Sequence, residues 1–338
     1  MTITAEQSRS RSYRRALKAE ISGHMDESAL QRCPINHPAL LSYKANVLGG
    51  RDTCQEYADW TEFLVEGHGP RRRCLSLGSG IGRVEQYLIR RGFTGEFESI
   101  ELNPSQVDEA NTRDQRIGAV VGDLNFVNLA PRDYDFILCH GVLHHLINLE
   151  HVLDQVNRAL TEDGLLLIYE YVGPDRWQYP RAQLDHLDAR HGLQLRNRPV
   201  WAVSGFETIR SFDLLRLLQH YWGQTALHTV NYGSAFHPVI HCGGWPDAKP
   251  RVGEIIAHDQ ELARSGTFPP SYHMGLYRKS TASSAEARPW PNEELAARAA
   301  PHVPWPALAQ HFARRVRARA ALRKRAKQAL RFLRTATQ

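Results

Sequence analysis

The chain has 338 residues, of which 42% are hydrophobic, and its 42 Lys and Arg against 36 Asp and Glu give a formal net charge of +6. This length and composition fit a globular protein with one large domain or two smaller ones. They exclude a membrane-spanning protein, because no apolar run reaches 18 residues. The polar N-terminus has no stretch typical of a signal peptide, so we expect a cytoplasmic protein.

Five cysteines are scattered along the chain without any C-x-x-C pair. We therefore expect neither a disulfide framework nor a zinc site, and no metal is predicted. Residues 1–30 are polar and basic, and they are expected to be poorly ordered or to form a loose helix. Pro38 and Thr53 begin two short helical patterns, which cover a sheet edge or close over a ligand.

Residues 74–88, CLSLGSGIGRVEQYL, combine a strand, a glycine turn and a helix. Glycines in such a turn allow positive φ and bring the backbone close to a ligand, although the turn can also serve only to pack the helix on the sheet. The third glycine comes one residue too early for the G-x-G-x-x-G dinucleotide fingerprint, with Arg83 in its place. No Gly-Lys-Ser/Thr of a Walker loop follows.

Four more strands are expected to alternate with helices after this turn, at residues 97–100, 119–121, 134–139 and 165–169, the last after a turn at Asp163 and Gly164. This alternation predicts a doubly wound, parallel α/β sheet. An acid follows two of the strands. Glu101 stands 23 residues after Gly78, where a carboxylate can accept both hydroxyls of a ribose, and Asp123 is either a second ligand acid or a turn residue.

With these motifs in register, residues 71–279 resemble the class I S-adenosylmethionine-dependent methyltransferases. More narrowly, five stretches resemble a bacterial subgroup associated with polysaccharide and glycolipid assembly: LSLGSGIGRVE, GDLN, HGVLHHLINLEHVL, IYEYVGPDRWQ and IRSFDLLRLLQHYW. The resemblance implies a Rossmann-like, seven-stranded, mostly parallel sheet, completed by strands at residues 225–232 and 272–278, the last one antiparallel. It also implies that the N-terminal helices often close over the cofactor.

The resemblance places S-adenosylmethionine on the glycine turn, with Glu101 on its ribose and Asp123 accepting a hydrogen bond from its adenine. One departure is Ser76, which stands where the family usually has an acid that orients the amino group of the cofactor. The predicted cofactor-binding residues are Ser76, Leu77, Gly78, Ser79, Gly80, Gly82, Glu101, Leu102, Asp123, Leu124, Cys139 and His140.

A hydroxyl acceptor must lose a proton during methyl transfer, so a base is expected at the carboxyl ends of the fourth and fifth strands. The predicted catalytic residues are His140, His144, His145 and Glu170. His140 is best placed by position, and at least one of the two other histidines is expected only to cap the following helix or to pack beneath the loop.

The segment after the fifth strand should border the acceptor, because open α/β sheets bind ligands outside the carboxyl ends of their strands. Its predicted substrate residues are Tyr171, Arg176 and Trp177, although ordinary packing explains Trp177 equally well. Ser211 is then expected to cap a strongly apolar helix.

Residues 281–306 are expected to form a linker, and residues 307–338 a basic amphipathic helical tail. The last 44 residues contain 11 Lys or Arg and no Asp or Glu. Three interpretations stay open: a solvated or docked helix, a peripheral contact with anionic lipid at the inner face of the membrane or with a protein, and nucleic-acid binding. The last is least favoured, because the chain without its tail is acidic.

The predicted organisation is therefore an N-terminal part at residues 1–70, a methyltransferase domain at 71–280, the linker and the tail. The predicted activity is methyl transfer from S-adenosylmethionine, with a hydroxyl of a sugar, glycan or glycolipid intermediate as the leading acceptor. The alternatives are methylation of another small molecule such as an amine, phenol or quinone, a non-catalytic binding module, and a dehydrogenase, which the glycine spacing disfavours. The oligomeric state is not predicted.

Overall fold

The computed structural model describes residues 11–23, 33–49, 60–198 and 205–281. These residues all belong to one compact unit. Residues 282–338 lie outside the described residues, so the linker and the basic tail stay predictions, as does the start of the helix expected after Thr53. Among the described helices, none has the length and apolar character that crossing a membrane requires.

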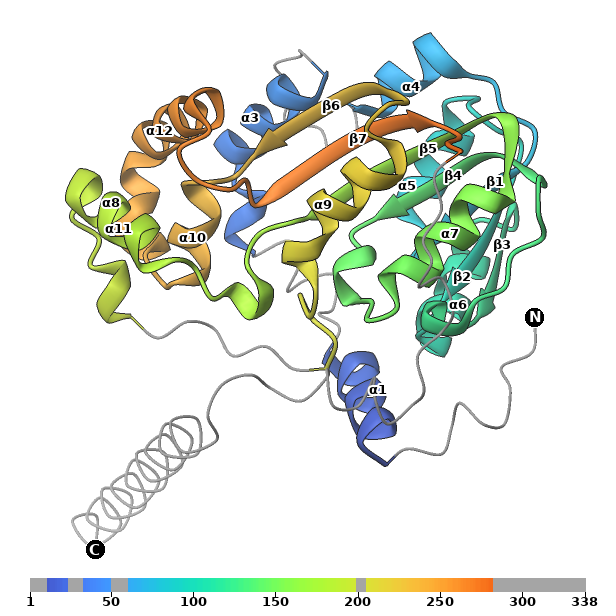
Figure 1. The fold of residues 1–338 in the computed structure, drawn as a ribbon, viewed down its shortest axis with the longest axis horizontal. Helices are drawn as coiled ribbons and strands as arrows, with labels where there is room; N and C mark the ends of the chain where they lie inside the picture. Colours follow the sequence, from blue (N-terminus) through green and yellow to red (C-terminus); the bar gives the residue numbers. More distant parts are fainter. Residues whose placement is uncertain (1–10, 24–32, 50–59, 199–204, 282–338) are drawn as a thin grey trace, which may run out of the picture. The chain divides into compact units, whose positions relative to one another are not determined.

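A seven-stranded sheet in the order β3-β2-β1-β4-β5-β7-β6 forms the centre of the unit (Figure 1). Neighbours among the first five strands pair in parallel, whereas β7 runs antiparallel to both β5 and β6. The doubly wound, mostly parallel sheet predicted from the sequence is therefore confirmed. Its strands are β1 (Cys74–Leu77), β2 (Phe97–Glu101), β3 (Ile117–Val121), β4 (Tyr134–His140), β5 (Leu160–Tyr171), β6 (Ala226–Tyr232) and β7 (Tyr272–Arg278).

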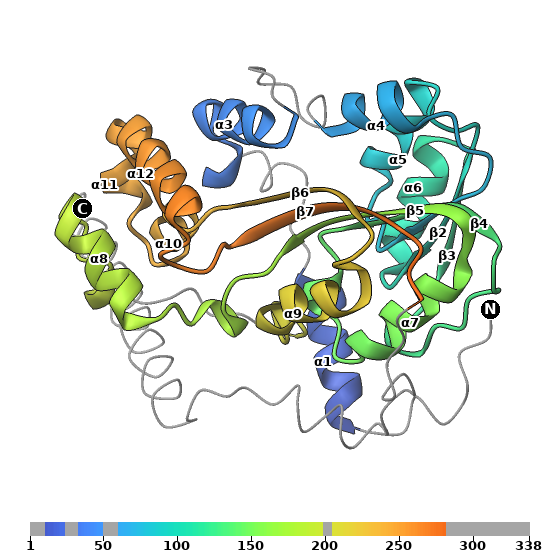
Figure 2. The ribbon, with the colours of Figure 1, turned by 45° about the horizontal axis from the view of Figure 1, so that its top comes forward.

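Helices cover both faces of this sheet, as Figure 2 shows. On one face lie α3 (Pro38–Gly49), α4 (Trp60–His68), α5 (Arg83–Arg90) and α6 (Pro104–Arg113), and on the other α7 (Leu149–Ala159) and α9 (Ser211–Trp222). Central strands are buried on both sides: in β4, Phe136 and Leu138 pack into one apolar core, whereas Ile137 and Cys139 pack into the other. This two-sided burial explains why the strands are short continuous apolar runs.

A further group of helices lies beyond the sheet (Figure 1) and extends the apolar core that contains Phe136 and Leu138. It consists of α8 (Arg181–His191), α10 (Phe236–His241), α11 (Trp245–Ala248) and α12 (Val252–Ser265). Buried residues such as Leu187, Ile240 and Ile255 belong to the same core as the strands. These helices follow β5 and β6 in the chain and were not expected from the sequence.

Two local predictions are wrong. The turn expected at Asp163 and Gly164 lies inside β5, which begins at Leu160, and the register of its pairing with β4 shifts there instead. Ser211 does not cap α9 but is its first residue, and its hydroxyl donates to the carbonyl of Gly173 at 2.9 Å. The carboxylate of Asp175 accepts the backbone N–H of the second residue of α9 at 2.9 Å, so the cap comes from a segment distant in sequence.

Helix α1 (Arg11–Gly23) lies below the sheet and its flanking helices in the view of Figure 1. Two of its side chains, Tyr13 and Glu20, are buried. The tyrosine ring packs on Phe126 and Phe206, at centroid distances of 5.8 and 5.3 Å. This segment is therefore a helix with a packed face rather than a loose one.

Candidate active site at the carboxyl ends of the strands

The turn between β1 and α5 contains three glycines with positive φ, and the space around each differs. A Cβ on Gly78 would lie 2.3 Å from a methyl of Val142, and one on Gly82 would lie 2.8 Å from the Cδ1 of Ile117. A Cβ on Gly80 would meet no atom within 4 Å. The outer two glycines are therefore required by packing, whereas Gly80 leaves open space at which a ligand can approach the backbone.

Glu101 ends β2 beside this turn. Its carboxylate accepts the backbone N–H of Gly80 at 3.0 Å and that of Asn103 at 2.9 Å. Asn103 in turn caps α6 through its side chain, which accepts the backbone N–H of Ser105 at 3.1 Å. The predicted ribose acid and the glycine turn are therefore in direct contact at the carboxyl edge of the sheet.

Beneath the turn, Glu85 of α5 places its carboxyl group next to Ser76 of β1. The Ser76 hydroxyl donates to Oε1 of Glu85 at 2.5 Å, and both side chains are buried. Burial and, to a smaller extent, the charge of Glu101 raise the pKa of Glu85 to about 7, against the opposing hydrogen bond from Ser76. Glu85, nine residues after Ser76, thus places a carboxyl group beside the position at which the family usually has an acid.

Asp123 follows β3 and holds a hydrogen-bond network of its own. Tyr13 of α1 donates to its Oδ2 at 2.5 Å, and the backbone N–H of Asn125 donates to its Oδ1 at 3.0 Å. Burial raises the pKa of Asp123 despite these donors. An adenine amino group would have to share this carboxylate with Tyr13, so α1 borders the predicted cofactor position.

The remaining predicted cofactor residues lie along the same edge. Leu77 and Cys139 are paired neighbours at the ends of β1 and β4. The hydroxyl of Ser79 accepts a hydrogen bond from Ser99 at 2.5 Å. Leu102 follows β2, and Leu124 is buried where a short helix, η3 (Leu124–Phe126), begins after β3. All twelve predicted positions thus lie on four adjacent strands or the turns that follow them.

His140 is the last residue of β4 and is partly buried. Its imidazole stacks on Trp60, with ring centroids 5.7 Å apart, and tilts against Tyr169 at 5.0 Å. Burial lowers the pKa of His140 to about 4, against the opposing charge of Glu170. At neutral pH the imidazole is therefore uncharged.

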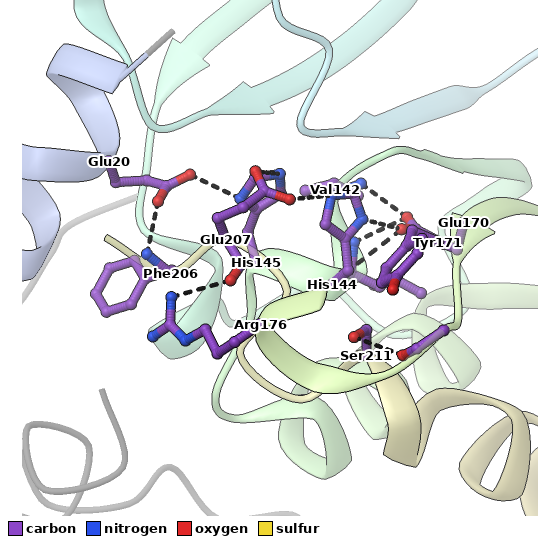
Figure 3. Close-up of polar contacts among 12 residues, drawn as sticks. Glu20, Val142, His144, His145, Glu170, Tyr171, Arg176, Phe206, Glu207 and Ser211 are labelled. Carbon is purple, nitrogen blue, oxygen red and sulfur yellow. Dashed lines mark hydrogen bonds and ion pairs between the residues drawn. The ribbon is translucent and has the colours of Figure 1, made fainter. Parts of the chain in front are cut away.

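Glu170 is fully buried near the end of β5 and holds the loop that follows β4. Its Oε1 accepts the backbone N–H groups of Val142 and Leu143 at 2.7 and 2.8 Å, and its Oε2 lies 2.7 Å from Nδ1 of His144. Figure 3 shows this contact between the carboxylate and the imidazole. Glu170 thus positions the loop and orients His144, a role different from that of the base predicted from the sequence.

His145 faces two further carboxylates (Figure 3). Oε1 of Glu20 lies 2.7 Å from its Nδ1, and Oε2 of Glu207 lies 3.8 Å from its Nε2. Burial would lower the pKa of His145, but Glu207 and Glu20 together raise it to about 9. His144 and His145 both belong to the short helix η4 (Leu143–His145), not to α7 that follows.

The three predicted substrate residues are largely engaged with the protein itself. Tyr171 is buried and donates to the carbonyl of Pro174 at 3.0 Å. The guanidinium of Arg176 donates to the carbonyls of Glu207 and Gly205 at 3.0 and 3.1 Å, beside the two histidines (Figure 3). Trp177 packs on His241, with ring centroids 4.1 Å apart, so packing accounts for its position.

His241 provides a test of this packing through the pH dependence of stability. Burial lowers its pKa from 6.5 to about 3. Below pH 6.5 the unfolded chain takes up a proton that the folded protein does not, so this one group costs about 2 kcal/mol of stability at pH 5. The Tm of His241→Gln should therefore fall less between pH 7 and pH 5 than that of the native protein. If the Tm values of the two proteins fell equally between pH 7 and pH 5, His241 would not be buried in its neutral form.

Comparisons with known proteins found a matching family model and a partly similar curated protein. A family model described as a methyltransferase domain matches residues 50–222. An uncharacterized protein of Synechococcus sp. is 32% identical over 108 residues, which cover 30% of this chain and 26% of that protein. The chain thus spans about a quarter of this curated relative.

Among solved structures, a TehB-like SAM-dependent methyltransferase from Corynebacterium glutamicum is 30% identical, with a TM-score of 0.31, over 33% of this chain and 62% of that one. A geranyl diphosphate C-methyltransferase from Streptomyces coelicolor, crystallised with Mg²⁺, geranyl diphosphate and S-adenosyl-L-homocysteine, is 14% identical. That match covers 82% of this chain and 99% of that one, with a TM-score of 0.43.

Proposed function

The chain belongs to the methyltransferase-domain family, in its class I, S-adenosylmethionine-dependent form, and we propose that it methylates a hydroxyl of a sugar, glycan or glycolipid intermediate. The observation that carries the proposal is an uncharged imidazole, that of His140, at the end of the strand beside the glycine turn. An alcohol needs such a base, because it is a poor nucleophile at neutral pH.

The residues at the carboxyl edge fit the cofactor. Open space at Gly80 admits a ligand to the backbone, and the carboxylate of Glu101 lies beside it. Glu85 adds a buried carboxyl group under the same turn. When bound, S-adenosylmethionine supplies a methyl group on a cationic sulfur, and the Glu101 carboxylate at this edge would stabilise positive charge.

The contribution of the chain is to hold the acceptor, exclude water and take its proton. Trp60 and Tyr169 flank His140 with aromatic rings, which limit access of water to the imidazole. Glu170 fixes the loop after β4 through two backbone N–H groups. In this scheme a ring nitrogen of His140 would accept the hydroxyl proton as the acceptor oxygen bonds to the methyl carbon, while the bond between that carbon and the cofactor sulfur breaks and its electron pair stays on sulfur.

The sugar acceptor is supported by the five sequence stretches that resemble the polysaccharide and glycolipid subgroup. The test is to incubate the full chain with S-adenosylmethionine labelled on its methyl group and with fractionated glycans, lipids and small molecules. We expect label in a saccharide fraction, stable to mild alkali, as an ether is and a methyl ester is not. Label confined to amine, phenol or quinone fractions would contradict the proposal that the acceptor is a sugar hydroxyl. Cofactor binding without any labelled product would indicate a non-catalytic binding module.

A further inference from the structure

Two consecutive histidines of η4 and one carboxylate converge on a common point (Figure 3). Nε2 of His144 lies 3.7 Å from one carboxylate oxygen of Glu207, and Nε2 of His145 lies 3.8 Å from the other. We call these three residues the histidine–glutamate cluster. Their candidate ligand atoms lie within 4.8 Å of one another. Both separations exceed a hydrogen bond, so the atoms face one another without being directly bonded.

The other ring nitrogen of each histidine faces a different carboxylate. Nδ1 of His144 lies 2.7 Å from Glu170, which is fully buried. Nδ1 of His145 lies 2.7 Å from Glu20, which is also buried. A carboxylate at Nδ1 is the usual partner of a metal-binding histidine, because it fixes the ring and leaves Nε2 to present its lone pair.

The local charge and backbone also favour a cation. Three carboxylates, those of Glu20, Glu170 and Glu207, surround two imidazoles. The guanidinium of Arg176 gives its hydrogen bonds to backbone carbonyls beside the cluster. Arg176 and Thr208 have positive φ although neither is glycine, and their backbones are hydrogen-bonded at 3.0 Å. Such strain is typically retained where a site requires a particular geometry.

We propose that the histidine–glutamate cluster binds a divalent cation of the late first-row series, with Nε2 of His144, Nε2 of His145 and the Glu207 carboxylate as ligands. Two imidazoles and a carboxylate suit zinc, iron, cobalt or nickel better than magnesium, which prefers oxygen ligands. Small side-chain rotations would bring each ligand atom to the 2.0–2.2 Å that such ions need. This proposal replaces the expectation that the protein holds no metal.

Three protein ligands leave at least one coordination position open. If the proposed function holds, that position would take the acceptor oxygen and make its hydroxyl more acidic. Binding of the cation itself does not depend on that function. It is therefore measured without any acceptor, so that a failure of metal binding and a failure of methyl transfer can be told apart.

The test uses the untagged full chain, stripped with a chelator and titrated at pH 8 with Zn²⁺, Mn²⁺ or Mg²⁺ by calorimetry. We expect about one Zn²⁺ per chain, retained on desalting and detected by elemental analysis, and weaker binding of Mg²⁺. Glu207→Gln and His145→Gln should each weaken Zn²⁺ binding at least tenfold. Circular dichroism establishes that each variant is folded.

His186→Gln is the matched control. His186 belongs to a separate group, with its Nε2 3.1 Å from Nε2 of His258, so its loss should leave Zn²⁺ affinity unchanged. Failure of the native chain to bind Zn²⁺ would overturn the proposal, and the histidine–glutamate cluster would then be only an ion-pair network. Binding that survives Glu207→Gln, or that is lost in His186→Gln instead, would place the cation elsewhere and would equally overturn it.

Discussion

Replacing His140 by asparagine should lower kcat by about 10²- to 10⁴-fold, the usual contribution of a general base. The affinity for S-adenosylmethionine should change little, because the glycine turn and Glu101 stay in place. The prediction depends on the position of the imidazole after β4 and on its uncharged state at neutral pH. The measurement is single-turnover methyl transfer with the acceptor that the labelling experiment identifies.

The pH profile separates His140 from an ordinary histidine base. A base loses activity as the pH falls through its pKa, because its protonated form cannot accept the acceptor proton. With the pKa of His140 lowered to about 4 by burial, kcat should be nearly constant between pH 6 and 8. An unperturbed histidine would instead give a decline below about pH 6.5.

His228→Asn is the matched control for His140→Asn. His228 also lies on a strand, is partly buried and packs on an aromatic ring, that of Phe63 at 5.0 Å. It belongs to β6, away from the glycine turn, so its loss should leave kcat unchanged. If His140→Asn retains native turnover, the acceptor needs no base at this position, and an amine or a more acidic hydroxyl becomes the better candidate.

Much of the fold was predictable because the signals are local in the sequence. Each central strand is a short apolar run followed by a turn, and parallel pairing through helices follows from that alternation. The contact between Glu101 and Gly80 was predictable for the same reason, because Glu101 ends β2 and Gly80 lies in the turn after the neighbouring strand β1. The N-cap at Asn103 is encoded within three residues and was likewise predictable.

The interior of the site was less predictable because its partners are distant in sequence. Glu20 reaches His145 from a helix 125 residues earlier, and Glu207 reaches it from a segment after α8. Glu85 looks like an ordinary helical acid in the sequence, and only the packing of α5 brings it to Ser76. No periodicity encodes such contacts, since it specifies which face of an element is apolar but not which polar residue another element will place against it.

Replacing Gly80 by alanine should weaken S-adenosylmethionine binding more than tenfold while leaving the protein folded. The methyl group would extend into the open space beside the turn, where no atom of the chain lies within 4 Å. It would therefore collide with a bound cofactor instead of with the protein. Glu101→Gln should have an effect of similar size, because charge-assisted hydrogen bonds contribute about 1.5 to 3 kcal/mol each. Calorimetric titration with S-adenosylmethionine measures both.

Gly92→Ala separates this steric effect from backbone strain. Gly92 follows α5 with φ +78°, and a Cβ there meets no atom within 4 Å, just as at Gly80 with φ +54°. Both variants therefore carry a similar cost for an L-residue in a left-handed conformation, about 1 kcal/mol, but only Gly80 lies in the turn. Both should have similarly reduced Tm values, whereas only Gly80→Ala should lose cofactor affinity. Equal affinity in the two variants would mean that the cofactor does not approach the backbone at Gly80, and the assignment of this turn to the cofactor would be wrong.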